Sequence, residues 1–315
     1  MKQYFRIGPM LVTQANALSG GLLIGMPAMY AYTGWLKGMC LRLSKQGQVS
    51  VTPLGVSPIL HTFSLHRGHA KYVRYRPGQL AEVAGRGPNH PTVDEQKASF
   101  ELSVIIAIES KDLEIQTASI AACISGMKIS GGGISPVGLK DVHIRVKKID
   151  AITRCFDGLP FNAVALSDAS YVLDDARSAG LDGFDAMLQA LAAPSGFATA
   201  KVGAFERPVW MPKEGRFLPA CVGAIALESF KSPSERQGIR QADNATLEMP
   251  TKHAFAESAF TLIRAQTIAS VRAQSRLAAA SEGQIAGPSV FWKEVPPEPG
   301  QLPFYGAQAR TVNEI

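Results

Sequence analysis

The chain lacks the sequence patterns that mark metal sites, secretion and the common catalytic motifs. Its four cysteines lie far apart and form no CxxC pair, which excludes a zinc ribbon and a thioredoxin-like motif. The patterns HExxH and GxSxG and a Walker loop are also absent. The N-terminus has no apolar signal core, and the longest apolar runs are too short to cross a bilayer. We therefore expect a soluble cytoplasmic protein with buried free thiols and with no metal or cofactor.

Composition favours a globular protein with an anionic partner. The 315 residues are 46% hydrophobic and 18% charged, enough for a sizeable core in one elaborated domain or two. The net charge is +6, with 29 glycines and 20 prolines that predict many turns. Because many basic proteins bind nothing acidic, the placement of the charges has to decide what the partner is.

Residues 1–150 have the element order of a ferredoxin-like fold. The predicted strands are near 4–13, 49–65, 100–109 and 142–149, with helices near 28–44 and 115–127. A basic insertion, 66–98, separates two β-α-β units. That order predicts an α+β protein with a ferredoxin-like (RRM-like) core, in which a four-stranded antiparallel sheet carries two helices on one face.

Residues 151–315 are expected to form an α/β, largely helical C-terminal extension that packs on the core and on neighbouring subunits. The pattern predicts a helix over 182–192, a strand pair over 207–211 and 217–230, and a long helix over 253–280. The long helix would be apolar on two sides, as in a helix packed between two partners. The proline-rich tail after 288 is expected to be extended.

The insertion concentrates positive charge and interleaves it with aromatic side chains. The residues that we single out are Arg67, Lys71, Tyr72, Arg74, Tyr75 and Arg76. Such a ribbon can neutralise phosphates and stack a base, although a solvated surface hairpin would have the same composition. A second basic cluster favours RNA, and its members are Lys140, Arg145, Lys147, Lys148 and Arg154.

Two further motifs have simple structural explanations. His66 and His69 have no carboxylate or cysteine nearby in sequence, so polar side chains on a basic loop are favoured over a metal site. Gly131, Gly132 and Gly133 form a tight turn whose backbone can approach another strand or a phosphate closely.

Several segments together resemble one known family. They are Leu11-Val12-Thr13-Gln14-Ala15-Asn16-Ala17-Leu18-Ser19, Gly25-Met26-Pro27, Tyr32-Thr33-Gly34-Trp35, 100–107, 128–136 and Gly215-Arg216-Phe217-Leu218-Pro219. In these segments the chain resembles the second subunit of the type I-F Csy complex, a CRISPR Cascade ribonucleoprotein. The resemblance implies a non-catalytic subunit that holds the 5′ handle of the CRISPR guide RNA and supports neighbouring subunits.

The resemblance also implies where RNA would lie. The opening loop and the glycine turn would face RNA, and the insertion would be a thumb that clamps it. The RNA-binding residues expected outside the insertion are Gln14, Asn16, Ser19, Lys128, Gly131, Gly132, Gly133, Arg145 and Lys147. The expected partners are guide RNA, other Cascade subunits and, indirectly or at the protospacer-adjacent end, target DNA.

Two alternatives stay open. The chain resembles the guide-coating backbone subunits in fold, and copy number per complex would separate the two roles. It is also compatible with a metal-independent guide-RNA processing endoribonuclease, with His66, His69 and Tyr72 as candidate catalytic residues.

Overall fold

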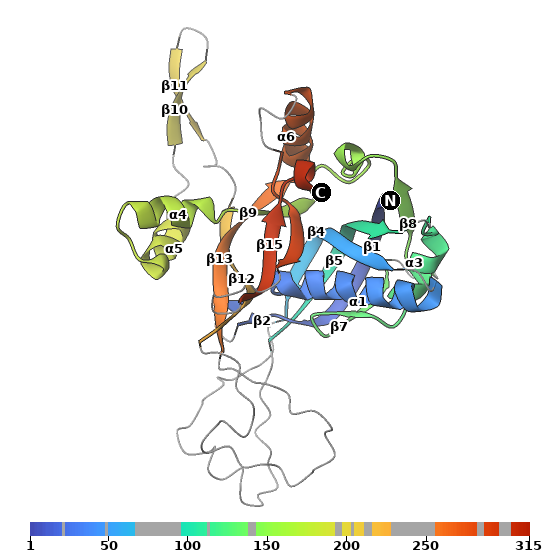
Figure 1. The fold of residues 1–315 in the computed structure, drawn as a ribbon. Coiled ribbons are helices and arrows are strands. Elements are labelled where there is room, and N and C mark those ends of the chain that lie inside the picture. Colours follow the sequence, from blue (N-terminus) through green and yellow to red (C-terminus); the bar gives the residue numbers. More distant parts are fainter. Residues whose placement is uncertain are drawn as a thin grey trace, which may run out of the picture.

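The protein is built around one large sheet with helices on both faces (Figure 1). The computed structural model describes residues 1–20, 23–47, 50–66, 96–111, 114–137, 143–192, 197–202, 205–210, 216–227, 256–281, 287–295 and 304–315. Within these ranges the main sheet has 11 strands, all paired antiparallel. Five α-helices accompany it in the same part of the chain. The protein is thus α+β, as predicted.

The first half of the chain follows the predicted order of strands and helices. Its main elements are β1 (Lys2–Asn16), α1 (Met29–Gly47), β4 (Val51–Leu65), β5 (Lys97–Ser110), α3 (Thr117–Ile124), β6 (Lys128–Ile129), β7 (Gly132–Pro136) and β8 (Val146–Ile149). The strands lie side by side in the order β4-β5-β1, with β7 and β8 both paired to the far side of β1. The four segments predicted as strands of one sheet are therefore confirmed as neighbours in one sheet.

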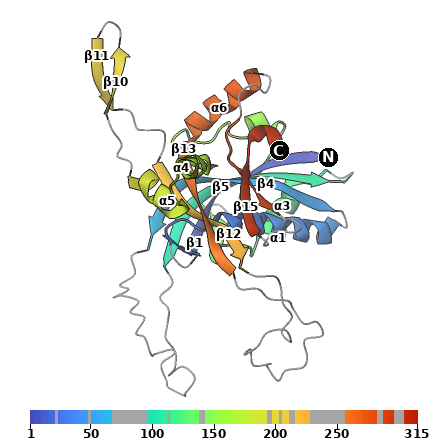
Figure 2. The same cartoon turned by 60° about the vertical axis from the view of Figure 1, so that its left-hand side comes forward.

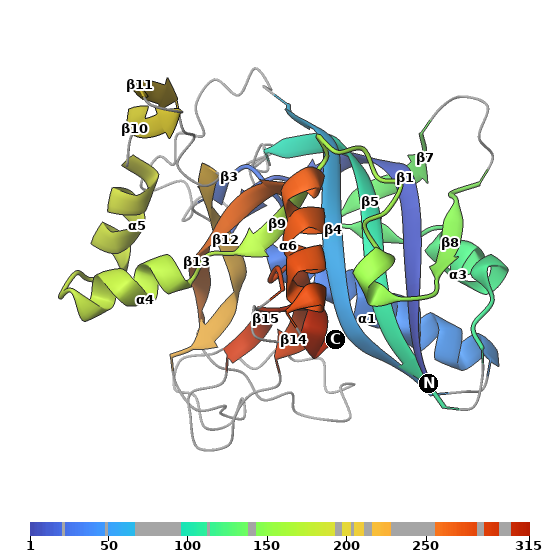
Figure 3. The same cartoon turned by 90° about the horizontal axis from the view of Figure 1, so that it is seen from above.

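Alternate residues of the central strand β5 face two different cores. Val104 and Ile106 pack with α1 and α3 on one face, while Ile105 packs on the other face with Ile268 of α6 (Ile268–Ala280). Successive side chains of a strand point to opposite faces, so a strand buried on both sides reads as the continuous apolar run seen here. Figure 3 shows α6 on the near side of the sheet and α1 behind it.

The strands after residue 151 continue the same sheet beyond β4. They are β9 (Val164–Asp168), β12 (Arg216–Ala226), β13 (Ala256–Thr267), β14 (Phe291–Val295) and β15 (Phe304–Arg310), in the order β14-β15-β12-β13-β9-β4. Trp292 of β14 also pairs with Val56 of β4, so this half of the sheet curls back on itself. The Trp292 indole is buried and donates to the Leu166 carbonyl at 2.9 Å.

Three smaller units complete the fold. The helices α4 (Tyr171–Ser178) and α5 (Gly183–Ala192) pack against β13 and β12 (Figure 2). Their shared core contains Leu173, Ala186 and Leu262. The strands β10 (Phe197–Val202) and β11 (Phe205–Trp210) form a separate two-stranded sheet, and β2 (Leu18–Ser19) pairs with β3 (Leu23–Ile24).

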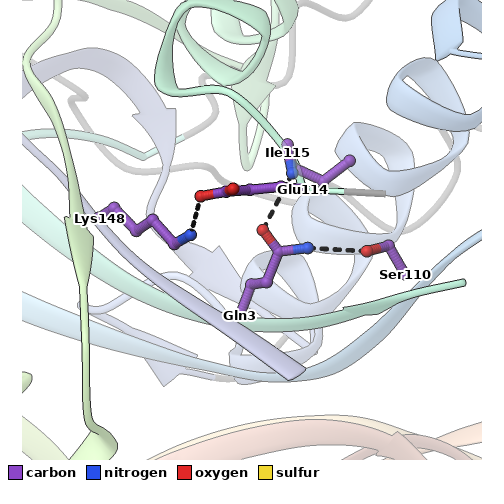
Figure 4. A network of polar contacts seen from close by, with 5 residues as sticks. All are labelled: Gln3, Ser110, Glu114, Ile115 and Lys148. Carbon is purple, nitrogen blue, oxygen red and sulfur yellow. Dashed lines mark hydrogen bonds and ion pairs between the residues drawn. The ribbon is translucent and has the colours of Figure 1, made fainter. Parts of the chain in front are cut away.

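Buried polar contacts tie β1 to the segments that precede α3, and an exposed ion pair lies next to them (Figure 4). The Gln3 side chain is 2% exposed, donates to the Ser110 hydroxyl at 2.7 Å and accepts from the Ile115 N–H at 2.9 Å. Next to it, Lys148 of β8 forms an ion pair with Glu114. Because buried amides need partners, the Gln3 bonds fix the start of β1 against the end of β5 and the segment that leads into α3.

The prediction of a long helix over 253–280 is wrong for its first half. Residues 256–267 form strand β13, and the helix begins only at Ile268, where Thr267 accepts from the Ser270 N–H at 3.4 Å as an N-cap. Pairing with β12 and β9 outweighs the helical spacing that these residues also have. On the shortened helix, Ile268 and Val271 are fully buried while Leu277 is 57% exposed.

The predicted strand pairing in the same region is also wrong. β11 pairs with β10, and β12 pairs with β13 and β15, so the segments near 207–211 and 217–230 are not partners. The extension is also richer in strands than predicted, because short strands between turns have weak periodicity. Within the described residues no helix is both long and apolar enough to cross a membrane.

Candidate nucleic-acid interface

The end of β1 and the glycine turn meet in space. The Asn16 N–H donates to the Ser130 carbonyl at 2.8 Å, and the Ser130 hydroxyl donates to the Asn16 carbonyl at 3.2 Å. A pocket of about 380 Å³, called the loop pocket here, opens between them. It is lined by Asn16, Leu18, Ser19, Ala28, Tyr30, Ala31, Lys97, Ser130 and Gly131.

Local chemistry explains the shape of this loop. The Asn16 side chain accepts from the Leu18 N–H at 3.1 Å, an Asx turn that starts the β2–β3 hairpin. The Ser19 side chain is buried, and its hydroxyl donates to the Met26 carbonyl at 2.9 Å. Gln14 is exposed and has a positive φ of 58° at a bulge in β1. A non-glycine residue in this conformation stores strain, which is typical of functional loops.

The three glycines of the turn have different surroundings. A Cβ on Gly132 would lie 2.8 Å from the Ala15 backbone, so this residue lets β7 approach β1 closely. Gly131 has a positive φ of 79° and is exposed, with open space where its side chain would be. Gly133 and Lys128 are exposed and paired across the turn. The backbone that can reach a ligand is therefore at Gly131 and Gly133, while Gly132 faces β1.

A second pocket lies on the face of the sheet opposite α1. This sheet pocket has a volume of about 550 Å³ and a floor made by β1, β4 and β5. Its walls come from β8 and from the segment after residue 157. The lining residues are Arg6, Gly8, Pro9, His61, Glu101, Ser103, Arg145, Lys147, Gly158, Leu159, Pro160, Asn162 and Ala163. Its charged side chains are three cations and the single carboxylate of Glu101.

Two of these cations face each other across a pair of strands. Arg6 of β1 is directly opposite Lys147 of β8 in the antiparallel register. Like charges in this position destabilise a sheet. Burial lowers the pKa of Arg6, and the nearby charge of Arg272 lowers it further. The fold therefore gathers positive charge at this pocket, as expected for a site that receives an anion.

The wall of the sheet pocket is held rigidly. Arg272 of α6 donates to the Phe156 carbonyl at 2.7 Å and to the Leu159 carbonyl at 2.7 Å, and Arg6 donates to the Asp157 carbonyl. The first N–H groups of α6 donate to the carbonyls of Ala163 and Phe161, at 2.8 and 3.2 Å. These bonds satisfy donors that a helix start would otherwise leave unpaired.

The floor of the sheet pocket contains a histidine–serine pair. His61 Nε2 lies 2.8 Å from the Ser103 hydroxyl. Burial lowers the pKa of His61, and the Glu101 carboxylate opposes that shift. Burial therefore favours the neutral form of His61. A similar pair joins His66 to Ser99 at 2.8 Å, further along the same two strands.

Polar side chains of β5 contribute to both pockets. Lys97 lines the loop pocket, whereas Glu101 and Ser103 line the sheet pocket. Together with Ser99 they are alternate residues of one regular strand and share the face opposite α1, because Ala98, Phe100 and Leu102 pack with α1. We call these four residues the β5 polar track. The six steps along the strand from Lys97 to Ser103 span about 20 Å.

A comparison with protein-family models identifies the chain's relatives. The model for a CRISPR-associated protein (Cas_Csy2) matches residues 7–283, which is most of the sequence. The chain belongs to the Csy2 family. A search of curated proteins found no match. Membership of the Csy2 family confirms the resemblance to a type I-F Csy subunit and indicates a component of a multi-subunit CRISPR complex.

The predicted RNA-binding residues of this Csy2-family chain fall into three groups. Asn16, Ser19 and Gly131 line the loop pocket, with Gln14, Lys128, Gly132 and Gly133 around it. Arg145 and Lys147 line the sheet pocket instead. The remaining six predicted residues, which are Arg67, Lys71, Tyr72, Arg74, Tyr75 and Arg76, lie outside the described residues.

Several residues of the two pockets were missed by sequence reasoning. Arg6, His61, Glu101 and Ser103 come from segments recognised only as strands. The alternation of β1 is enough to place Arg6 on the other face of the strand from Phe5 and Ile7. Only the register with β8 shows that Arg6 is paired with Lys147. In the described part of the chain no three His, Cys, Asp or Glu side chains gather as metal ligands do. All four cysteines are free and buried, as predicted.

Proposed function

We propose that this protein is a non-catalytic, RNA-binding subunit of a type I-F surveillance complex. It holds the 5′ handle of the guide RNA along β5, between the sheet pocket on the face opposite α1 and the loop pocket beside the start of α1. The observation that carries the proposal is the like-charged pair Arg6 and Lys147, gathered with Arg145 around one pocket. Phosphate groups of a nucleic acid offset the repulsion between these cations.

The spacing of the pockets favours a single strand over a duplex. The β5 polar track provides hydroxyl, carboxylate and ammonium groups over about 20 Å of one strand. Tyr30 lines the loop pocket and is 45% exposed, and Phe161, which follows the lining residue Pro160 of the sheet pocket, is 74% exposed. Exposed aromatic rings next to cations stack unpaired bases, which a duplex does not offer.

The strand order supports a ferredoxin-like core for residues 1–150. The chain order β1-α1-β4-β5-α3-β8 is a β-α-β-β-α-β order, and its strands lie side by side as β4-β5-β1-β8. The first and third strands, β1 and β5, are therefore central, and α1 and α3 cover one face. RNA-binding domains of this plan place RNA on the other face, over the two central strands. The sheet pocket lies over β1 and β5, in the corresponding position. The basic insertion would act as a thumb beyond the end of the β4–β5 pair.

A contact with a neighbouring protein subunit also belongs to this proposal. Phe184, Leu188 and Leu191 occupy one side of α5 and are 68%, 48% and 40% exposed. The acids Asp174, Asp175, Asp182 and Asp185 of the same helix pair and its connecting loop are also exposed, in a chain of net charge +6. An apolar stripe with an acidic rim fits a protein surface with a basic rim and repels nucleic acid.

One binding experiment tests the proposal. The full chain is titrated into labelled 5′-handle RNA and into a scrambled RNA of the same length, with chelator present. We expect tighter binding of the handle and no shortening of either RNA. Cleavage of the RNA would favour the processing endoribonuclease instead. Several copies bound per RNA molecule would favour the backbone subunit, and equal affinity for both RNAs would refute the handle role.

A further inference from the structure

The sheet pocket contains a feature that phosphate binding does not explain. Glu101 lies on its floor, among Arg6, Arg145 and Lys147. A carboxylate repels a phosphate and can only accept hydrogen bonds. A ligand that suits both parts of the pocket therefore has an anionic group for the cations and N–H donors for Glu101. A nucleotide has both.

An exposed aromatic residue lies between two lining residues of the same pocket along the chain. Phe161 lies between Pro160 and Asn162, which both line the pocket, and its side chain is 74% exposed. Its backbone is fixed, since its carbonyl accepts from the Ala269 N–H at 3.2 Å. A large apolar side chain held in water on a rigid segment is a platform for stacking a base. The pocket volume of about 550 Å³ is within the range of small-molecule sites and accommodates one nucleotide.

The acceptor on the floor discriminates among the four bases. Guanine presents two adjacent donors, N1–H and the N2 amino group, on its Watson–Crick edge, and one carboxylate can accept both. Adenine, cytosine and uracil present donors at only one position on that edge. Paired hydrogen bonds of this kind are stronger and more selective than single ones.

We propose that the sheet pocket binds one unstacked guanosine nucleotide of the guide RNA, with Glu101 reading the base, Phe161 stacking on it, and the three cations holding its phosphates. The inference rests on the proposed RNA-binding function and adds base selectivity to it. His61 is a positioning residue, since its bond to Ser103 and its proximity to Glu101 orient the floor.

Base-substituted oligonucleotides test the inference. Labelled hexauridylates with guanosine, inosine, adenosine, cytidine or uridine at one central position are titrated into the full chain. Inosine keeps N1–H and lacks the N2 amino group. We expect guanosine to bind on the order of tenfold more tightly than uridine, with inosine between them. Glu101→Gln should remove most of the difference between guanosine and inosine, and Phe161→Ala should weaken all five oligonucleotides.

The outcomes separate this inference from the proposed function. Equal binding of all five oligonucleotides by the wild-type chain would refute base reading and leave RNA binding intact. Failure to bind any oligonucleotide or the handle RNA would refute both. Glu109→Gln, an exposed glutamate on the same strand outside the pocket, is the matched control and should leave the base preference unchanged. A Glu101→Gln protein that is folded and keeps the wild-type preference would also overturn the assignment.

Discussion

Arg6 and Lys147 lie directly opposite each other on β1 and β8, so two positive charges share one face of the sheet. Replacing Lys147 with glutamine removes the repulsion and should raise the free energy of unfolding by roughly 0.2–1 kcal/mol at low salt. The gain should shrink as salt screens the charges. Urea denaturation of the RNA-free protein measures it.

The neighbouring lysine provides the control for this change. Lys148 is ion-paired with Glu114, so Lys148→Gln should leave stability unchanged or lower it by up to about 1 kcal/mol. A Lys147→Gln protein less stable than wild type would contradict the view that this charge is kept for a ligand.

Gly132 is expected to be intolerant of any side chain. In Gly132→Ala the new methyl group would meet the Ala15 backbone at 2.8 Å, so β7 must move away from β1. We expect a loss of roughly 1–3 kcal/mol in the free energy of unfolding. Gly133→Ala is the matched control, because the nearest atom there is the Thr13 hydroxyl at 3.8 Å, and its effect should be within about 0.5 kcal/mol. Equal stabilities of the two variants would show that the close approach is not required.

His61 should make stability depend on pH below neutrality. Burial lowers its pKa from the ordinary value of 6.5, so the unfolded chain takes up a proton before the folded chain does. The stability contributed by neutral His61 is therefore present above that ordinary pKa and is lost as pH falls through the folded pKa. His61→Gln removes this component.

The comparison needs denaturation curves at about pH 7.5 and about pH 5.5, on either side of the ordinary histidine pKa. We expect the wild-type protein to lose more stability than His61→Gln between these two conditions. A difference between the two proteins that does not change with pH would contradict a lowered pKa.

The apolar stripe on α5 should matter for assembly and not for RNA. Replacing Phe184 and Leu188 with serine removes exposed side chains, so the isolated protein should keep its stability within about 0.5 kcal/mol. We expect this variant to bind handle RNA normally and to co-purify with fewer partner subunits. Leu41→Ser, at another exposed leucine on a helix, is the control and should assemble normally. Full assembly of the double variant would rule out the contact.

Local patterns in the sequence were sufficient to predict the strands of the first half, but the contact between the opening loop and the glycine turn emerges only in the structure. The continuous apolar run of β5 predicts a buried central strand, and Asn16 and Gly131 do line one pocket. Residues 253–280 could not be assigned in the same way, because Phe260, Leu262 and Ile263 satisfy a helical and a strand spacing almost equally. Pairing with β12 and β9 decides between them, and those partners are distant in sequence.

The sheet pocket was beyond sequence reasoning for a related reason. The sequence shows Arg145 and Lys147 as part of a basic cluster. Arg6 and Glu101 lie near them only because β8 pairs with β1 and β1 pairs with β5 in one particular register. Phe161 resembles an ordinary core residue in the sequence, and its exposure follows from the bonds that fix residues 156–163 against α6. The basic insertion stays a prediction.

The salt dependence of handle-RNA affinity tests the central claim most directly. Each phosphate contact to a single strand contributes about 0.7 to the slope of log affinity against log salt. If Arg145 and Lys147 both contact phosphates, replacing both with glutamine should flatten the slope by about 1.4 and weaken binding at low salt. Lines for the folded double variant that superimpose on those of the wild-type protein would contradict RNA binding at the sheet pocket.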